Sequence, residues 1–252
     1  MIKVLVNGAM GKMGKEVINA INEDKETQLA GAVDIMGDGI SVYKELIEAI
    51  NITKPDVIVD FTQPSAIFEN AKLCLNVGVS IVIGTTGLSE AQIDELKNLS
   101  EQNNVGCLIA PNFSTGAVLM MKFAKLAASY FNNAEIIELH HNQKKDAPSG
   151  TAIKTAQLMA EANSDFTFEN CPEKETLQGA RGANANANIH IHSVRMPGFM
   201  ASQEVIFGSM GQTLKIRHDS TDRKCYMPGV MLAVKHIANN KEFIYGLDKI
   251  MK

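Results

Sequence analysis

The stretch that decides the fold is Ile2-Lys3-Val4-Leu5-Val6-Asn7-Gly8-Ala9-Met10-Gly11-Lys12-Met13-Gly14. Its first five residues form a short apolar run, typical of a buried strand, and three glycines follow. Apolar residues then recur at helical spacing, which predicts a helix with one buried stripe. They are Met10, Met13, Val17, Ile18 and Ile21. Strand, glycine turn and helix are the first half of a βαβ unit.

The three glycines have the spacing G-x-x-G-x-x-G, whereas the commoner nucleotide-binding turn is G-x-G-x-x-G. In such a turn Gly8 permits the tight bend, Gly11 lets the backbone approach a pyrophosphate, and Gly14 lets helix and strand pack closely. The spacing alone is not specific, so the prediction of a nucleotide site depends on the residues that follow.

The next strand supplies the acid that a dinucleotide site requires. It runs over residues 29–33 and ends in Asp34, 20 positions after Gly14, where a carboxylate binds the adenine-ribose hydroxyls. The competing interpretation of Asp34 is a solvated acid at a strand end. Ile35 stands where an Arg would favour the 2′-phosphate of NADP, but Lys12 offers a cation in the turn. The sequence therefore favours NADH and leaves NADPH open.

Strands and helices continue to alternate up to residue 112, which predicts an open parallel sheet. Strands are expected over 56–61, 80–83 and 106–110, with helices from 64 to 76 and from a capping box at Ser89 and Gln92. Because ligands bind beyond the carboxyl ends of parallel strands, the loops at these ends predict a cofactor cleft. The cofactor-binding residues expected from the glycine turn, Asp34 and these loops are Gly8, Ala9, Met10, Gly11, Lys12, Met13, Gly14, Asp34, Phe61, Thr62, Gly84, Thr85, Thr86, Ala110, Pro111, Asn112 and Phe113.

The pattern of the second half differs. Helices are expected over 120–130, 151–162 and 228–239, and a strand over 135–140. The glycine- and asparagine-rich residues 178–188 suggest a mobile loop, and three strands over 189–195, 203–207 and 213–218 suggest an antiparallel meander. The fold class is therefore α/β. A Rossmann-like dinucleotide-binding domain (1–112 and 223–252) is joined to an α+β domain (113–222) with a mixed, largely antiparallel sheet.

The run His140-His141-Asn142-Gln143-Lys144-Lys145-Asp146-Ala147-Pro148-Ser149-Gly150-Thr151 carries the chemistry of this half. It sets two imidazoles and two ammonium groups before a turn that opens a helix. A helix N-terminus attracts carboxylates and phosphates, and a histidine can supply a proton. The run therefore predicts a site for an anionic substrate, against the alternative of a solvated polar loop.

Composition narrows the class of protein. Of the 252 residues 45% are hydrophobic and 6% aromatic, and the net charge of −4 argues against nucleic acid as a partner. Four dispersed cysteines, Cys74, Cys107, Cys171 and Cys225, indicate reduced thiols and no metal site. With neither a signal peptide nor a long apolar segment, we expect a cytoplasmic protein that is not bound to a membrane.

These motifs resemble the 4-hydroxy-tetrahydrodipicolinate reductase family, also called dihydrodipicolinate reductases, over nearly the whole chain. The resemblance rests on the glycine turn, on Asp60-Phe61-Thr62, Ile83-Gly84-Thr85-Thr86-Gly87 and Asn112-Phe113-Ser114, and on one long signature. That signature is E-x-H-H-x-x-K-x-D-A-P-S-G-T, here Glu138 to Thr151. Two departures are Asn142, where members often have Arg, and Ile35, where Arg is frequent in the cofactor pocket.

The resemblance implies a reaction and a set of roles. It implies NADH- or NADPH-dependent reduction of 4-hydroxy-tetrahydrodipicolinate to tetrahydrodipicolinate in diaminopimelate and lysine biosynthesis. His140 is then the proton donor and Lys144 its catalytic partner. The substrate's carboxylates are bound by His141, Lys144, Ser149, Gly150 and Thr151. The family also implies a homotetramer formed through the sheet of the second domain.

Two alternatives stay open at this point. Another two-domain NAD(P)-dependent dehydrogenase shares the nucleotide half but not the signature at residues 138–151. A non-catalytic NAD-binding regulator would need a DNA-binding module or a basic face, and the sequence indicates neither.

Overall fold

The computed structural model describes residues 1–164, 166 and 174–251. The chain forms two compact units, residues 1–115 with 223–252, and residues 116–222. The first unit thus ends at Thr115, where the sequence suggests residue 112. Each unit has its own sheet and hydrophobic core, and each is described by itself.

Six parallel strands form the sheet of the first unit, in the order β11-β5-β4-β3-β1-β2. The strands are β1 (Ile2–Asn7), β2 (Thr27–Val33), β3 (Val57–Asp60), β4 (Ser80–Ile83), β5 (Cys107–Ile109) and β11 (Phe243–Tyr245). The central strands are buried on both faces, which explains their unbroken apolar runs. The order changes direction at β1, so β1 and the strands beside it flank the point where α/β sheets bind ligands.

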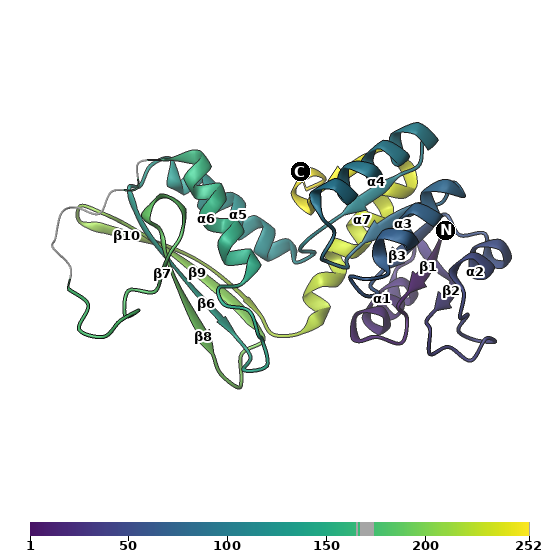
Figure 1. Cartoon of the computed structure of the whole chain (residues 1–252), viewed down its shortest axis with the longest axis horizontal. Helices are drawn as coiled ribbons and strands as arrows, with labels where there is room; N and C mark the ends of the chain where they lie inside the picture. The colour runs from purple at the N-terminus through teal and green to yellow at the C-terminus, as the bar shows by residue number, and fades with distance from the viewer. Residues whose placement is uncertain (165, 167–173, 252) are drawn as a thin grey trace. The chain divides into compact units, whose positions relative to one another are not determined.

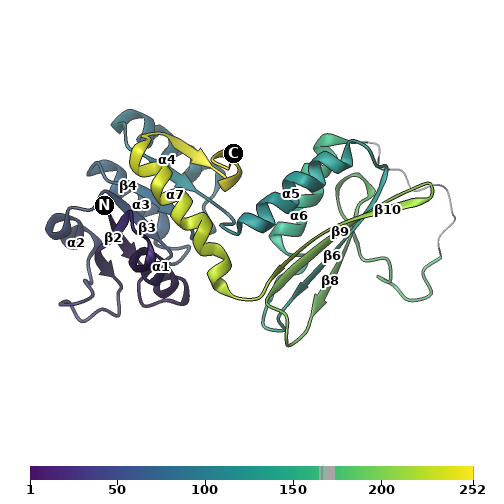
Figure 2. The same ribbon diagram turned by 180° about the vertical axis from the view of Figure 1, so that it is seen from behind.

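Helices cover both faces of this sheet (Figures 1 and 2). One face carries α1 (Lys12–Glu23) and α7 (Met227–Asn239), and the other carries α2 (Leu46–Thr53), α3 (Ile67–Asn76) and α4 (Glu90–Asn103). Two short 3-10 turns, η2 (Arg223–Tyr226) and η3 (Leu247–Lys249), precede α7 and follow β11. The C-terminal segment therefore completes the first unit by adding α7 and the edge strand β11.

Local signals predicted most of these elements. The capping box is confirmed, since Ser89 accepts from the backbone N–H of Gln92 while the Gln92 side chain accepts from that of Ser89. The expected apolar stripe of α1 is wrong at its first member. Met10 lies in the turn before the helix and is 46% exposed, because the glycine turn delays the helix to Lys12. α2 and β11 are additions that the sequence pattern did not predict.

The second unit is a five-stranded mixed sheet in the order β10-β9-β6-β8-β7. Its elements are α5 (Thr115–Ala128), β6 (Asn133–His140), α6 (Gly150–Ala162), β7 (Ala183–Asn184), the 3-10 turn η1 (Asn186–Asn188), β8 (His190–Arg195), β9 (Ala201–Ser209) and β10 (Gln212–Ser220). Helices α5 and α6 cover one face of the sheet (Figures 1 and 2). Small residues of both helices pack there on Ile136, Ile191, Val205 and Phe207.

Two expectations for this unit need correction. The last three strands do not form a simple meander, because β6 lies between β8 and β9 and pairs parallel with β8 and antiparallel with β9. β6 alternates buried and half-buried residues along its length, so it is stabilised best at the centre of the sheet. The segment 178–188 is not simply a loop, since it contributes the edge strand β7, which pairs with β8, and the turn η1.

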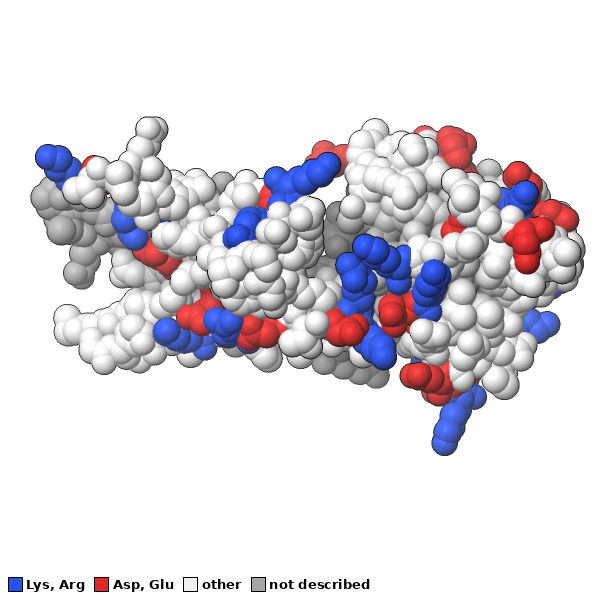
Figure 3. All heavy atoms as spheres, turned by 90° about the horizontal axis from the view of Figure 1, so that it is seen from below, with Lys and Arg blue, Asp and Glu red and all other residues white. Residues whose placement is uncertain are grey.

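The surface carries charges of both signs. On the face drawn in Figure 3, basic and acidic side chains lie next to each other rather than in one basic patch. Lys235, for example, pairs with Asp24 at 2.7 Å and with Glu26 at 2.6 Å. Within the described residues, Cys74 and Cys107 are buried free thiols and Cys225 is half-buried, while Cys171 lies outside them. Across the same residues no helix is long and apolar enough to cross a membrane.

Candidate active site

The loops expected to hold the cofactor leave the sheet of the first unit at the same edge. Backbone hydrogen bonds extend the parallel ladder past the strand ends, from Phe61 N to Asn7 O (3.0 Å) and from Gly84 N to Asp60 O (2.9 Å). A third bond joins Ala110 N to Ile83 O at 3.1 Å. The carboxyl ends of β1, β3, β4 and β5 therefore lie in register, and the residues that follow them are neighbours.

The glycine turn brings backbone against backbone. Gly8 has φ +81°, in the left-handed region, and a Cβ on it would lie 2.5 Å from the carbonyl oxygen of Phe61. A Cβ on Gly14 would collide with the carbonyl oxygen of Gly8. Only glycine therefore permits this approach of α1 to β1 and β3, and α1 begins directly at the turn.

A cavity of about 690 Å³ lies beside this turn, within the range of small-molecule sites. Six of the residues expected to bind the cofactor line it, namely Gly8, Met10, Gly11, Asp34, Phe61 and Thr62. The sequence did not assign the rest of the lining to the cofactor. Those residues are Asn7, Val33, Ile35, Met36, Lys44, Glu45, Leu46, Ile47, Gln63, Ser65, Ala66, Asn70 and Leu73. Most of them come from α2, from α3 and from the segments before these helices.

Asp34 is oriented by backbone groups at the end of β2. One carboxylate oxygen accepts from Met10 N and the other from Met36 N, each at 3.0 Å. A carboxylate has about four lone-pair sites, so further donors can still bind. Ile35 beside it is 85% exposed. The acid is thus held at the wall of the cavity by the turn that it helps to order.

Asp60 is a buried hub beneath these loops. Its fully buried carboxylate accepts from Asn7 Nδ2 (2.7 Å), Thr62 N (2.9 Å), Thr62 Oγ1 (2.7 Å), Asn70 Nδ2 (3.0 Å) and Thr85 Oγ1 (3.3 Å). Burial raises the pKa of Asp60, while the hydrogen bonds from Thr62, Asn7 and Asn70 act in the opposite direction. One side chain therefore ties together the ends of β1, β3 and β4 and the start of α3.

The remaining expected cofactor residues lie along the same edge without lining the cavity. The rings of Phe61 and Phe113 are 5.9 Å apart, and Gly84 lies directly against the Phe61 ring. Asn112 accepts from Ser114 N at 2.8 Å. Of the others, Ala9, Thr85 and Ala110 are buried, Thr86 and Pro111 are exposed, and Lys12, Met13 and Gly14 form the first turn of α1.

In the second unit the signature residues converge on Glu138, which is fully buried in β6. Its oxygen Oε2 lies 2.5 Å from His140 Nδ1 and 2.8 Å from an Arg195 nitrogen. Its oxygen Oε1 accepts from Arg195 at 2.7 Å and from Ser149 N at 3.2 Å. The carboxylate thus joins a histidine of the same strand, an arginine of β8 and the residue before α6.

Glu138 remains ionised in this position. Burial opposes the charge, but hydrogen bonds from His140, Arg195 and Ser193 outweigh it and lower the pKa of Glu138 to about 2. An ionised carboxylate only accepts hydrogen bonds, so His140 Nδ1 must carry the proton of the bond between them. Among the residues described, His140 Nε2 makes no hydrogen bond, and the side chain is 16% exposed. Nε2 is therefore the ring nitrogen that is available to a ligand.

Lys144 lies within the same connected cluster. Its ammonium group binds both oxygens of Asp146, at 2.7 and 2.8 Å, and Arg195 donates to the backbone oxygen of Asp146 at 2.7 Å. The Lys144 side chain is 20% exposed and that of Asp146 is 62% exposed. The hydrogen bond from Lys144 lowers the pKa of Asp146. A carboxylate ligand would compete with an exposed aspartate for this lysine.

At the start of α6, one of the expected substrate ligands already makes hydrogen bonds within the protein. Ser149 caps the helix by accepting from Ala152 N at 3.2 Å, and its own backbone N–H binds Glu138. Gly150 is exposed at the first helical position with open space around it, and Thr151 follows half-buried. His141 is half-buried and accepts from Gln143 N at 3.2 Å. Of the five expected substrate ligands, Ser149 therefore holds the helix and Glu138 in place.

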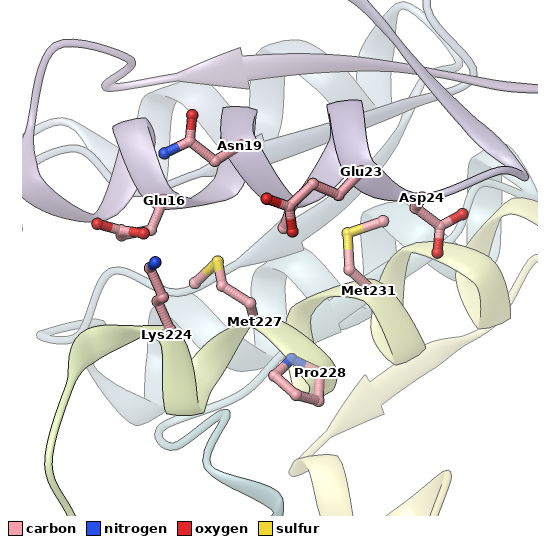
Figure 4. Close-up of a pocket in the computed structure, with 9 residues that line it drawn as sticks. Glu16, Asn19, Glu23, Asp24, Lys224, Met227, Pro228 and Met231 are labelled. Carbon is pink, nitrogen blue, oxygen red and sulfur yellow. The ribbon is translucent and has the colours of Figure 1, made fainter.

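A second cavity of about 370 Å³ lies between α1 and the start of α7 (Figure 4). Glu16, Asn19, Glu23 and Asp24 of the α1 segment face Lys224, Met227, Pro228 and Met231 across it (Figure 4). None of the expected site residues lines it, and Asp24 is already paired with Lys235. Across the described part of the chain no group of three or more His, Cys, Asp or Glu side chains could hold a metal ion.

Sequence reasoning missed three residues that organise these sites, Asp60, Glu138 and Arg195. Glu138 was named only as the first residue of the signature. Asp60 was quoted only as part of a motif, although an acid inside an otherwise apolar strand is a signal of a buried, hydrogen-bonded role. Arg195 had no such signal. It ends β8 beside His140 only because β6 and β8 pair, and the two residues are far apart in the sequence.

The first unit defines the class of protein. A parallel sheet, a glycine turn after its first strand, an acid at the end of its second strand and a cavity at that edge are those of a Rossmann-like dinucleotide-binding protein. Comparison with known proteins gives the family. The family description "Dihydrodipicolinate reductase, N-terminus" matches residues 2–113, and "Dihydrodipicolinate reductase, C-terminus" matches residues 116–251.

Named relatives agree over the full length. The chain is 50% identical over 262 residues to 4-hydroxy-tetrahydrodipicolinate reductase of Syntrophomonas wolfei, covering 99% of this chain and 98% of that protein. It is 47% identical over 270 residues to the Synechocystis enzyme of the same name, covering 100% and 98%. A solved structure, dipicolinate-bound dihydrodipicolinate reductase from Paenisporosarcina sp. TG-14, matches all of both chains with 44% identity and a TM-score of 0.92. The chain belongs to the dihydrodipicolinate reductase family, which confirms the resemblance in its sequence.

Proposed function

We propose that the chain reduces 4-hydroxy-tetrahydrodipicolinate to tetrahydrodipicolinate with NAD(P)H, in the diaminopimelate and lysine biosynthetic pathway. The observation that carries the proposal is the cluster of His140 and Lys144 around Glu138 and Asp146 at the start of α6. It combines a proton donor with a cation, which is what reduction of a dicarboxylate needs. The dinucleotide-type cavity of the first unit supplies the complementary half.

The first unit fits a nicotinamide dinucleotide. The glycine turn has no room for side chains at Gly8 and Gly14, so backbone N–H groups can approach a pyrophosphate there. Asp34 binds the adenine-ribose hydroxyls, and the residues of the sheet edge around Phe61, Gly84 and Phe113 bind the nicotinamide side. When bound, the reduced cofactor supplies a hydride.

The second unit binds the substrate and supplies the proton. Lys144 exchanges Asp146 for a substrate carboxylate, and His141, Gly150 and Thr151 bind the carboxylates with it. Ser149 holds the start of the helix. Loss of water from the 4-hydroxy compound gives a conjugated imine, and its reduction needs a hydride at one carbon and a proton at the far end of the conjugation. His140 donates that proton from Nε2 while Lys144 stabilises the negative charge that develops.

The dipicolinate-bound relative supports a small dicarboxylate as the ligand class. The proposal is tested by following oxidation of NADH and of NADPH by their absorbance, with substrate generated in place by the preceding synthase. Oxidation that requires the synthase supports the reaction. Absence of oxidation with both cofactors, in an assay where a known family member is active, overturns it.

We infer that NADH is the preferred cofactor. Asp34 lies at the ribose end of the cavity and Ile35 beside it offers no cation, so we expect the repulsion of the 2′-phosphate of NADPH by Asp34 to outweigh the attraction of Lys12 in the turn and of Lys44 in the lining. In the same assay kcat/KM should be higher for NADH. A preference for NADPH would overturn this inference without affecting the reaction.

We also propose that the chain forms a homotetramer and acts in the cytoplasm. In the part of the second unit that the structure describes, helices α5 and α6 lie on one face of the sheet, which supports association through the opposite face. Light scattering should give a mass four times that of the 27.4-kDa chain. Fractionation of cells should recover the activity with cytoplasmic markers.

The role of His140 is tested by His140→Gln. Loss of the proton donor should lower kcat by about 10²- to 10⁴-fold and leave the affinity for NADH within about twofold of wild type. Steady-state kinetics with NADH binding measured by its fluorescence separates the two effects. A variant with nearly unchanged kcat would show that His140 is not the proton donor.

A further inference from the structure

We propose that Glu138 is the positioning residue of the proton donor. With Arg195 as its counter-ion, it keeps His140 in the form that has a proton on Nδ1, so that Nε2 faces the substrate. The inference rests on the proposed function of His140 and extends it to two residues to which no role has been assigned.

The contacts and burial of Glu138 exclude a direct role in binding or protonating the substrate. Its two oxygens accept hydrogen bonds from His140 Nδ1, from two nitrogens of Arg195, from Ser149 N and from the Ser193 side chain. A carboxylate has about four acceptor positions, so these partners leave none for a further ligand. It is also fully buried, and so it cannot exchange a proton with solvent or touch a substrate.

Arg195 keeps this carboxylate charged and immobile. The guanidinium binds both oxygens of Glu138, the bidentate geometry in which arginine is strongest. It is itself anchored to the backbone oxygens of Val194 and Asp146, at 2.8 and 2.7 Å. Without Arg195 a buried anion would be disfavoured, and a protonated Glu138 could donate to His140 instead of accepting from it.

Glu138 affects the proton transfer through the N–H bonds of the His140 ring. The charged ring of His140 has N–H bonds on both nitrogens. When the Nε2–H bond breaks, the proton goes to the substrate, and the ring keeps Nδ1–H bonded to Glu138. Solvent then protonates Nε2 again. Glu138 thus stabilises both the charged ring and the one neutral form that donation from Nε2 produces.

Glu138→Gln reverses this preference. The oxygen of the introduced amide is favoured at the Oε1 position, where Ser149 N and an Arg195 nitrogen both donate, and this turns the NH₂ group of that amide toward His140. The ring must then accept at Nδ1, so its neutral form has the proton on Nε2 and donation from Nε2 is opposed. We expect kcat to fall by about tenfold to a hundredfold, as when a carboxylate that orients a metal-bound histidine is removed, with KM for NADH within about twofold of wild type.

The chain offers a matched control three residues earlier in β6. Glu135 also binds a histidine and an arginine, with His192 Nε2 at 2.8 Å and Arg181 at 2.6 Å. Alternation along the strand places it on the opposite face of the sheet from Glu138. Glu135→Gln makes the same chemical change, and should leave kcat within about twofold of wild type in protein with an unchanged mass by light scattering.

The ring nitrogens of His140 provide a readout that a merely structural role would not change. In the whole protein labelled with ¹⁵N-histidine, solid-state NMR distinguishes protonated from bare ring nitrogens, and His140→Gln identifies the His140 signals. At a pH where the ring is neutral, wild type and Glu135→Gln should have the proton on Nδ1. Glu138→Gln should have it on Nε2.

Glu138→Gln leaves the Arg195 charge buried without its partner, which is destabilising. A second variant therefore tests the inference in case Glu138→Gln does not fold. Glu138→Gln combined with Arg195→Gln removes both charges, while Ser149 N still donates at the Oε1 position and holds the amide oxygen there, so this variant should show the same loss of kcat and the same proton shift. Normal kcat in folded Glu138→Gln or in the folded double variant overturns the inference about Glu138 but not the proposed role of His140. A proton that stays on Nδ1 in these variants has the same consequence. Normal kcat in His140→Gln overturns the proposed proton donor and this inference with it.

Discussion

Two carboxylates, Asp60 and Glu138, are buried where each unit has its expected binding residues, and their surroundings differ in kind. Asp60 accepts only from neutral amides, hydroxyls and one backbone N–H. Glu138 has a guanidinium as its partner. Burial therefore raises the pKa of Asp60, while the bonds from His140 and Arg195 lower that of Glu138 to about 2. The first acid organises loops, whereas the second stabilises a positive charge beside it.

Removing Asp60 should destabilise the first unit. Asp60→Ala would leave five hydrogen-bond donors of the sheet edge without their acceptor, and a buried unsatisfied group is costly. We expect a loss on the order of 3 kcal/mol in the free energy of unfolding, measured by urea denaturation. The control is Asp56→Ala, which removes an exposed acid near the start of the same strand that accepts one bond, from Lys3 N. Equal effects of the two substitutions would contradict the role of Asp60.

Lys144 and Lys145 are adjacent in sequence but should differ in function. Lys144 belongs to the Asp146–Arg195 cluster, whereas Lys145 is exposed. Lys144→Ala removes a charge-assisted hydrogen bond to a substrate carboxylate, so KM for the substrate should rise by roughly tenfold or more. Lys145→Ala should leave it within about twofold. Similar values in steady-state kinetics for both variants would mean that Lys144 is only a solvated lysine.

At the scale of elements, the central position of β6 decides the geometry of the second unit. Its parallel pairing with β8 sets His140 beside Arg195, and its last residues lead into the turn before α6. Glu138 therefore connects two strands and a helix N-terminus through one carboxylate. The sequence predicted β6, β8 and α6 individually because each has its own periodicity. It did not predict their order, because strand order depends on which apolar faces pack together.

This connection should make stability dependent on pH in the acid range. The pKa of Glu138 is lowered from 4.5 to about 2 in the folded state, so its contribution is present above about pH 4.5 and is lost as the pH falls toward 2. Between about pH 5 and about pH 3, wild type should lose about 2 kcal/mol more than Glu138→Gln, which has no acid to protonate. Urea unfolding at both pH values measures the difference. Parallel losses in the two proteins would show that Glu138 is not the group responsible.

At the scale of the whole molecule, two units with separate cores share one chain. The chain leaves the first unit at Thr115 and returns at Arg223, after which α7 and β11 complete the first sheet. The glycine turn and capping box were readable from sequence because they are local. The three-residue strand β11 and the eight-residue helix α2 are too short to show a period of their own, and they are stabilised by the sheet on which they pack.

Because the two units have separate cores, a destabilising substitution in the core of the second unit should leave NADH binding by the first unit unchanged. Phe207 is fully buried in the second unit and packs on Phe131 with ring centroids 5.5 Å apart. Phe207→Leu should cost about 1 kcal/mol in the free energy of unfolding. NADH affinity, measured by its fluorescence, should stay within about twofold of wild type, because the residues proposed to bind NADH lie in the first unit. A clear loss of NADH affinity in folded Phe207→Leu, well beyond twofold, would contradict this separation.

The sequence by itself determined the class of fold and the family, and it supplied the residues proposed to carry the chemistry, because these depend on local order along the chain. Glycine spacing, apolar periodicity and the signature at residues 138–151 need no knowledge of distant partners. Only the tertiary structure decided which groups control that chemistry. Asp60 meets Asn7 across 53 positions and Glu138 meets Arg195 across 57. Such pairs arise when strands are placed side by side, and that placement is set by packing of the whole sheet rather than by any local pattern.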